Sequence, residues 1–291
     1  MTTLELILSN PLVLEVSTFF FGLLIGSFLN VVIYRLPLMM QNEWRSQCKE
    51  FLNMPPAALS APFANFNLAQ PCSHCPHCKH PLSALENIPV VSFLLQGGKC
   101  KHCLTPISMR YLTVETVTAV LSCVIAAHYG FTWLTLALLI FTWCLLALAI
   151  IDFDHQLLPD QITLPLLWLG LLINSQGWLT NLESAVWGAV GGYLILWVIY
   201  WIFKLLTGKE GMGFGDFKLL AALGAWLGWQ TLPQIILLSS LVGSLVGISL
   251  IISKGRDKNI PIPFGPYLAS AGFLALLYGD TITSLYFNIL V

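Results

Sequence analysis

The chain has 291 residues, of which 57% are hydrophobic and only 9% are charged, and its mean hydropathy is +0.79. Soluble domains carry about 25% charged residues, so this composition excludes an ordinary soluble enzyme and indicates a membrane protein. The net charge is −1, and without a basic patch the chain is not expected to bind nucleic acid.

Eight apolar stretches have the length of a membrane-spanning helix, which is about 20 residues. In chain order they cover residues 13–34, 111–128, 132–151, 161–178, 184–206, 217–231, 232–252 and 264–285. The first stretch lacks the basic start and the small-residue cleavage site of a secretory signal, so we expect it to be retained. The sequence therefore predicts an all-α polytopic membrane protein with about eight transmembrane helices.

The 13 Lys and Arg residues are unevenly distributed among the polar connections. They follow the first span, bracket the loop after the fifth span and follow the seventh span. All of them then lie on one side of the membrane, which the positive-inside rule assigns to the cytoplasm. We therefore expect both termini on the opposite side.

A long polar segment, residues 35–110, separates the first two spans. Its part 41–71 shows no clear period and is expected to be irregular or partly ordered. The segment contains two Cys-x-x-Cys pairs that are separated by 21 residues. This spacing is close to that of a tetrahedral zinc site, and cytoplasmic thiols seldom form disulfides. The predicted ligands of this structural zinc ion are Cys75, Cys78, Cys100 and Cys103.

The exact ligand set stays open, because Cys72 overlaps the first pair in a second Cys-x-x-Cys and several histidines stand nearby. The alternative interpretation of either pair is a redox motif, but no thioredoxin-like strand and helix accompanies it.

Two aspartates, Asp152 and Asp216, lie where long apolar stretches meet short polar loops. The predicted topology places both on the cytoplasmic side. A carboxylate costs about 2.5–3.5 kcal/mol at the centre of a membrane helix and less near its end, so a pair retained here indicates chemistry. The structural alternatives are a helix N-cap for Asp216 and a solvated helix end for Asp152. Asp154 is interpreted as an ordinary polar residue, and Asp160 is expected to be a cap.

A pair of carboxylates is the minimum apparatus of an aspartic protease. Two like charges about 3 Å apart cannot both ionise at neutral pH, so one member of such a pair stays protonated. The ionised member can accept a proton from a bridging water while the protonated member donates to the scissile carbonyl. Because the pair titrates as a unit, the sequence assigns neither role to one aspartate. The glycines before Asp216 allow a close approach of the backbone to a partner or substrate.

A series of short motifs runs through residues 20–280: Gly26–Val32, Arg35–Pro37, both cysteine pairs, Glu86–Pro89, Gly97–Cys100, Arg110–Tyr111 with Val114–Glu115, Asp152 with Leu158–Asp160, Gly213–Lys218 and Pro263–Tyr267. In content and order these motifs resemble the bifunctional prepilin peptidases. That family comprises the leader peptidase and N-methyltransferase enzymes of type IV pili and type II secretion. Two departures from its pattern are the extra Cys72 and Leu112, which stands where the family commonly has proline.

The resemblance implies an enzyme of the bacterial inner membrane, in which the termini expected from the distribution of Lys and Arg are periplasmic. It implies cleavage of the leader peptides of type IV prepilins and type II secretion pseudopilins at the cytoplasmic face. It also implies methylation of the new N-terminal residue with S-adenosylmethionine. Asp152 and Asp216 match the catalytic pair, and the four cysteines above match the cytoplasmic tetrad. No soluble methyltransferase fold is visible, so only Gly98 and its surroundings are candidates for binding the methyl donor.

These inferences divide the chain into a first span (1–34), a cytoplasmic zinc and methyl-transfer segment (35–110) and a transmembrane peptidase core (111–291). The expected partners are prepilin and pseudopilin substrates and the lipid bilayer, and no nucleic acid. One alternative is a GxGD-type intramembrane aspartic protease without methyl transfer, which would not need the cysteine segment. A transporter or assembly subunit is the other alternative, and it would predict inverted repeats with carboxylates at the membrane midplane.

Overall fold

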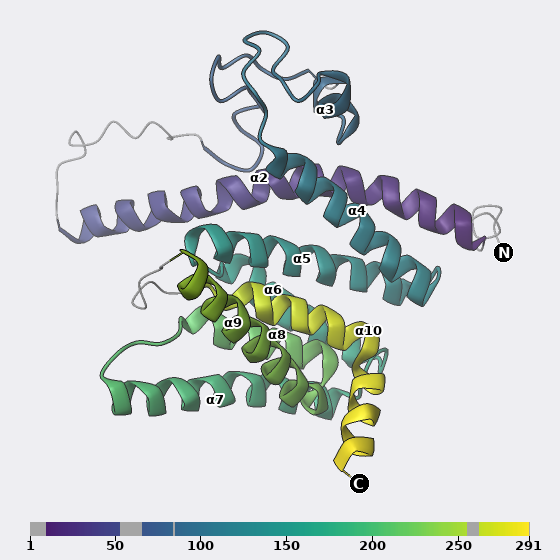
Figure 1. Cartoon of the computed structure of the whole chain (residues 1–291), viewed down its shortest axis with the longest axis vertical. Helices are drawn as coiled ribbons and strands as arrows, with labels where there is room; N and C mark the ends of the chain where they lie inside the picture. The colour runs from purple at the N-terminus through teal and green to yellow at the C-terminus, as the bar shows by residue number, and fades with distance from the viewer. Residues whose placement is uncertain (1–9, 53–65, 84, 255–261, 291) are drawn as a thin grey trace. The chain divides into compact units, whose positions relative to one another are not determined.

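The computed structural model describes residues 10–52, 66–83, 85–254 and 262–290, and within these ranges its regular structure is helical, with only isolated β-bridges (Figure 1). The chain divides into two compact units, Met1–Leu139 and Ile140–Val291. The all-α fold class predicted from the sequence is confirmed. Each unit carries one of the two groups of candidate site residues.

The first unit is built on two packed helices, α2 (Pro11–Phe51) and α4 (Met109–Tyr129). Glycines of α2 face α4 at the crossing. A Cβ on Gly22 would lie 2.7 Å from the Cα of Ala119, and one on Gly26 would lie 2.6 Å from the α4 backbone. Only residues without a side chain permit this approach, as is usual where membrane helices pack closely.

The segment between these helices contains η2 (Leu85–Asn87), α3 (Val91–Leu95) and the cysteine pairs. Buried Arg35 of α2 holds the start of the described part of this segment. Its guanidinium donates hydrogen bonds to the backbone carbonyls of Asn67, Leu68 and Pro71, at 2.9, 3.3 and 2.6 Å.

A second polar contact holds the segment at α4. Glu115 is buried in that helix, and its Oε2 accepts a hydrogen bond from the Val90 amide at 2.8 Å. Val90 has a φ of +60°, which L residues seldom adopt. The Glu115 carboxylate therefore fixes the backbone directly before α3.

The second unit contains most of α5 (Trp133–His155), which begins in the first unit. The later helices are α6 (Asp160–Asn174), α7 (Leu182–Thr207), α8 (Phe214–Leu227), η3 (Trp229–Thr231), α9 (Leu232–Lys254) and α10 (Gly265–Leu290).

Helix α8 is the core of the second unit. Its side chains are buried along most of its length, and the indole of Trp226 is fully buried and donates to the Leu166 carbonyl at 2.8 Å. Helix α7 packs closely on α8 because it carries glycines at the contact: a Cβ on Gly192 would lie 2.6 Å from the Leu220 carbonyl oxygen. This packing fixes α8, and with it the residues of its first turn.

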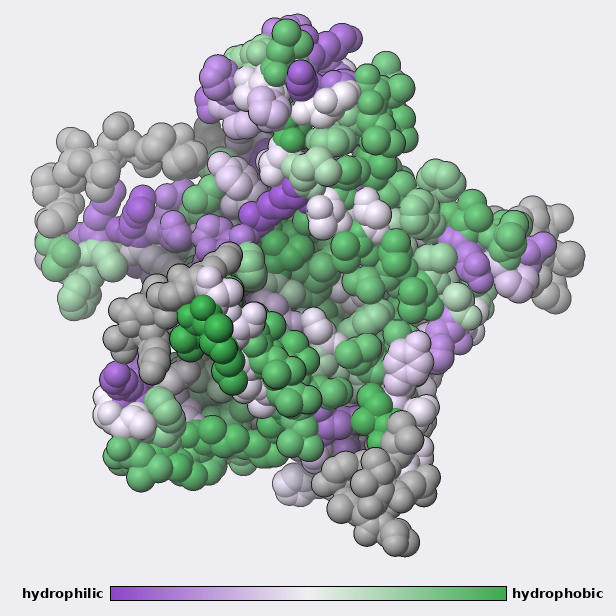
Figure 2. All heavy atoms as spheres, viewed as in Figure 1, coloured by the Kyte–Doolittle hydropathy of each residue, from purple (hydrophilic) through white to green (hydrophobic). Residues whose placement is uncertain are grey.

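Five helices in the described part of the chain are long and apolar enough to cross a membrane: Pro11–Phe51, Met109–Tyr129, Trp133–His155, Leu182–Thr207 and Trp229–Ser253. Apolar residues cover much of the visible helical surface, whereas hydrophilic residues gather over the C-terminal part of α2 and around the cysteine-containing segment (Figure 2). The chain is thus a multi-pass membrane protein, and the count of eight spans stays a proposal.

One expectation about the polar segment is wrong in part. The sequence predicts irregular or partly ordered structure from residue 41 onward, but residues 41–51 are regular helix and continue α2 to Phe51. The sequence there consists largely of residues with good helix propensity, such as Gln, Glu, Arg and Lys. Loss of hydropathy therefore marks the end of the membrane span and not the end of the helix. Residues 53–65 of the same stretch lie outside the described residues.

Candidate active site and metal centre

Asp152 lies in the last turn of α5 and is held by the start of α10. It is only 6% exposed, and its Oδ2 accepts a hydrogen bond from the Gly265 amide at 2.9 Å. The N-terminus of a helix offers unpaired amides and a partial positive charge, both of which favour a carboxylate. A Cβ on Gly265 would lie 2.7 Å from the same Oδ2. The contact therefore requires glycine.

Asp216 is the third residue of α8 and is 7% exposed. The N-cap of this helix is Gly213, so the interpretation of Asp216 as an N-cap is wrong. Among the described residues, its buried Oδ1 has no hydrogen-bond partner. A buried carboxylate oxygen without a partner is costly, and it can bind water or substrate.

The two aspartates are close enough to interact, since the charge of Asp152 acts on the carboxyl of Asp216. A contact between the segment after Asp152 and the segment before Asp216 supports this arrangement. A Cβ on Gly215 would lie 2.7 Å from the Cβ of Leu158, so the glycine-rich loop, residues 211–215, packs directly on the connection after α5. Asp154, by contrast, is exposed.

An ion pair joins the same two segments. The ammonium of Lys218, two residues after Asp216, lies 2.7 and 2.8 Å from the two carboxylate oxygens of Asp160. The sequence predicts Asp160 as a helix cap, but Pro159 occupies that position and Asp160 pairs with Lys218 instead. The motifs contain both residues but no signal that they meet.

The four cysteines predicted to bind zinc converge in the first unit, with their Sγ atoms within 4.8 Å of one another. Sγ atoms of Cys75 and Cys103 are 3.8 Å apart, and those of Cys78 and Cys100 are 4.0 Å apart. Zinc–sulfur bonds of about 2.3 Å in a tetrahedron place the sulfur atoms about 3.8 Å apart, so the spacing fits zinc. Among the described residues, Cys72 lies outside this group.

Both cysteine pairs lie in the same kind of backbone turn. The residue after the second cysteine, Lys79 in one turn and Leu104 in the other, has a φ of +59° and +57°, respectively. Backbone hydrogen bonds within the turn lower the pKa of Cys75, and hydrogen bonding to Thr105 lowers the pKa of Cys103 to about 6. Burial and the neighbouring cysteines instead raise the pKa of Cys78 to about 11. The turns therefore favour the thiolate, the form that binds metal, at Cys75 and Cys103 but not at Cys78.

A second group of metal-type side chains lies beside the cysteines. Ligand atoms of His80, Glu86 and His102 are within 4.8 Å of one another. However, the two imidazole rings stack with centroids 3.4 Å apart and planes tilted by 35°. An imidazole binds metal through a lone pair in its ring plane, and rings stacked in this way do not direct both lone pairs at one ion. We therefore assign no metal to this group.

Gly98 lies at the turn from α3 to the second cysteine pair. Its φ is +69°, its carbonyl accepts a hydrogen bond from the Ile107 amide at 2.7 Å, and a Cβ there would lie 3.0 Å from the Phe93 ring. These contacts support the interpretation of Gly97–Gly98 as a turn. A role of Gly98 in binding the methyl donor stays a prediction.

Two protein families match separate parts of the chain. The Bacterial Peptidase A24 N-terminal domain matches residues 20–129, and the Type IV leader peptidase family matches residues 139–248. The first match contains the four cysteines and the second contains both aspartates. No solved structure gives a significant match.

Curated relatives match nearly the whole chain. The prepilin leader peptidase/N-methyltransferase of Stutzerimonas stutzeri is 56% identical over 98% of each chain. Proteins of the same name from Aeromonas hydrophila and Pseudomonas aeruginosa are 57% identical over 92% of each chain and 53% identical over 98% of each chain. This similarity confirms the resemblance found in the motifs, and the chain belongs to the prepilin leader peptidase/N-methyltransferase family.

Proposed function

We propose that this chain is a bifunctional enzyme of the bacterial inner membrane. It removes the leader peptides of type IV prepilins and type II secretion pseudopilins, and it then methylates the new N-terminal residue with S-adenosylmethionine. The observation that carries the proposal is the pair of buried, interacting aspartates, Asp152 and Asp216. The names of the relatives, which combine both activities, support the proposed methylation.

Peptide cleavage needs only the two carboxyl groups and a water molecule. One carboxylate accepts a proton from the water, which attacks the scissile carbonyl, while the protonated partner donates to the carbonyl oxygen. The carboxyl group that took the proton from water then passes it to the leaving nitrogen. Collapse of the tetrahedral intermediate breaks the C–N bond and releases the leader and the new N-terminal amine. The amide of Gly265 fixes one carboxyl group, and the unpartnered Oδ1 of Asp216 is available to water or substrate.

We place the active site at the cytoplasmic face of the membrane. When the eight expected spans are used, all Lys and Arg residues lie on the side of both aspartates, either in the connections or at the span ends that border them. The termini are then periplasmic. The lipid bilayer and the prepilins and pseudopilins are the partners. In functional terms, residues 35–110 form the zinc and methyl-transfer segment, and residues 111–291 form the peptidase core.

The test is incubation of the purified enzyme with a prepilin, with and without S-adenosylmethionine, followed by mass spectrometry of the products. The proposed function requires a shortened pilin in both reactions and an added methyl group only in the presence of the donor. A shortened product that is never methylated would instead indicate a GxGD-type protease without methyl transfer. An uncut prepilin would indicate that the aspartates serve a transporter or assembly subunit and not a protease.

Cys75, Cys78, Cys100 and Cys103 are the proposed ligands of a structural zinc ion, which would hold the two turns together. We expect about one zinc per chain in the purified protein. Cys100→Ser should lower the zinc content, because it removes one sulfur from the group. Cys72→Ser is the matched control and should leave it unchanged. Unchanged zinc in the first variant, or loss in the second, would require a different ligand set.

Methyl transfer needs a donor held beside the new amine, and the loop at Gly98 is the proposed place. Gly98→Val is expected to reduce methylation of the cut pilin more than it reduces cleavage, because the aspartates belong to the other compact unit. Mass spectrometry of one product resolves both activities. Gly130→Val is the control: Gly130 also has a positive φ, +66°, but lies after α4. If both activities fall together in Gly98→Val, or neither changes, the donor is bound elsewhere.

A further inference from the structure

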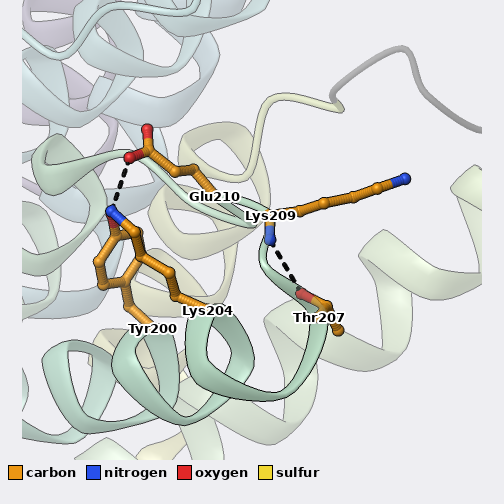
Figure 3. A network of polar contacts seen from close by, with 5 residues as sticks. All are labelled: Tyr200, Lys204, Thr207, Lys209 and Glu210. Carbon is orange, nitrogen blue, oxygen red and sulfur yellow. Dashed lines mark hydrogen bonds and ion pairs between the residues drawn. The ribbon is translucent and has the colours of Figure 1, made fainter.

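A polar cluster closes the end of α7 next to the glycine-rich loop. The ammonium of Lys204 donates hydrogen bonds to Glu210 Oε1 at 2.8 Å and to the Tyr200 hydroxyl at 3.2 Å (Figure 3). Helix α7 ends at Thr207, and its C-cap residue, Gly208, has a left-handed φ of +70°. The chain therefore reverses after this residue and brings Glu210 back onto the last turns of the helix.

The reversed segment also packs closely on α7. A Cβ on Gly211 would lie 2.7 Å from the ring of Phe203. The Thr207 hydroxyl donates to the Phe203 carbonyl at 2.7 Å and accepts from the Lys209 amide at 3.3 Å. The loop from Gly208 to Gly213 is thus held at both its backbone and its side chains.

Tyr200 connects this cluster with the aspartate. Its side chain is 3% exposed, and its ring contacts Phe214 and Phe217 with centroids 5.4 and 5.8 Å away. These two phenylalanines lie on either side of Asp216 in the sequence and contact each other at 5.3 Å. One residue therefore touches both the ion pair and the side chains that flank the aspartate.

We infer that Tyr200, Lys204 and Glu210 are positioning residues that set the place of Asp216 relative to Asp152. The inference deepens the proposed function and rests on it, because it requires that Asp216 takes part in cleavage. None of the three residues touches the reacting atoms. They act through the loop and through the aromatic contacts. A displacement of a reacting group by about 1 Å can lower a rate about 100-fold. Even an ion pair whose side chains are 35% (Lys204) and 69% (Glu210) exposed can therefore matter at this position.

The test is reversal and exchange of the charges in the full-length enzyme. Glu210→Lys places two ammonium groups together and is expected to lower kcat for prepilin cleavage about tenfold. KM should change less than about twofold, since substrate contacts are not removed. The exchanged variant Lys204→Glu/Glu210→Lys restores an opposite-charge pair and should recover kcat to within about threefold of the wild type. Lys204→Arg should also retain cleavage.

Lys209→Glu is the matched control. Lys209 is in the same loop, and its side chain points away from Glu210 (Figure 3), so a charge change of equal size there should leave kcat unchanged. An exchanged variant no better than Glu210→Lys, or a Glu210→Lys enzyme as active as the control, would overturn the inference. If Glu210→Lys does not fold, Glu210→Gln replaces it, with a smaller expected loss in kcat. A wild-type kcat in Glu210→Gln would also overturn the inference.

The result that would contradict the proposed function differs from the result that would contradict the positioning role. If Asp216→Asn cleaves prepilin, Asp216 is not catalytic and the inference falls with it. If Asp216→Asn is inactive while Glu210→Lys cleaves at the wild-type rate, only the positioning role is lost.

Discussion

Asp152→Asn and Asp216→Asn are each expected to lower prepilin cleavage by about 10³-fold or more, because an amide cannot take up and return a proton. Asparagine has nearly the same shape as aspartate, so membrane insertion and folding should be retained. In Asp152→Asn the side-chain amide oxygen can still accept the hydrogen bond that the Gly265 amide donates at this position. Cleavage is measured by the mass of the product, and folding by the thermal midpoint of the purified variants.

The two aspartates act as a unit in this mechanism, so the double variant should be hardly slower than either single variant. Asp154→Asn is the control, because Asp154 is exposed and two residues from Asp152, and it should retain cleavage. Substantial cleavage by either single variant, or multiplied losses in the double variant, would contradict the assignment of this pair.

Features that depend on local sequence could be predicted. The eight expected apolar stretches lie largely in helices, because about 20 apolar residues in a row are stable in a membrane only when their backbone groups are paired internally. Convergence of the four cysteines could also be predicted. Each Cys-x-x-Cys pair forms its own turn, and the number of residues between the two pairs is close to that of known zinc sites. Both aspartates lie near helix ends, where hydropathy changes.

Contacts between distant segments could not be predicted. Gly265 and Asp152 are 113 residues apart, and Lys218 and Asp160 are 58 residues apart. Whether such residues meet is decided by the packing of whole helices, which periodicity and spacing do not specify. The glycine of Pro263–Tyr267 is visible in the sequence as part of a motif. The structure alone shows why a glycine is needed there: its amide must approach a carboxylate without a Cβ between them.

Gly265→Ala is therefore expected to have the second-largest effect, a loss of about 100-fold in kcat for cleavage. The added Cβ would lie 2.7 Å from Asp152 Oδ2, where real Cβ atoms essentially never occur. Either the carboxylate moves or α10 moves, and in both cases the hydrogen bond of 2.9 Å from the Gly265 amide is strained. Methylation of a pilin that has already been cut should change much less, since the four clustered cysteines and Gly98 belong to the first unit.

Gly191→Ala in α7 is the matched control for Gly265→Ala. A Cβ on Gly191 would meet only Leu232 Cδ1, at 3.4 Å, and the end of a leucine side chain can move aside. Overpacking alone costs about 1–3 kcal/mol of stability, so the thermal midpoints of both variants must be measured with their rates. A Gly265→Ala enzyme that melts like the wild type but has lost kcat at unchanged KM supports placement of Asp152 by Gly265. Equal rates in Gly265→Ala and Gly191→Ala would mean that the carboxylate reaches its working position without help from α10.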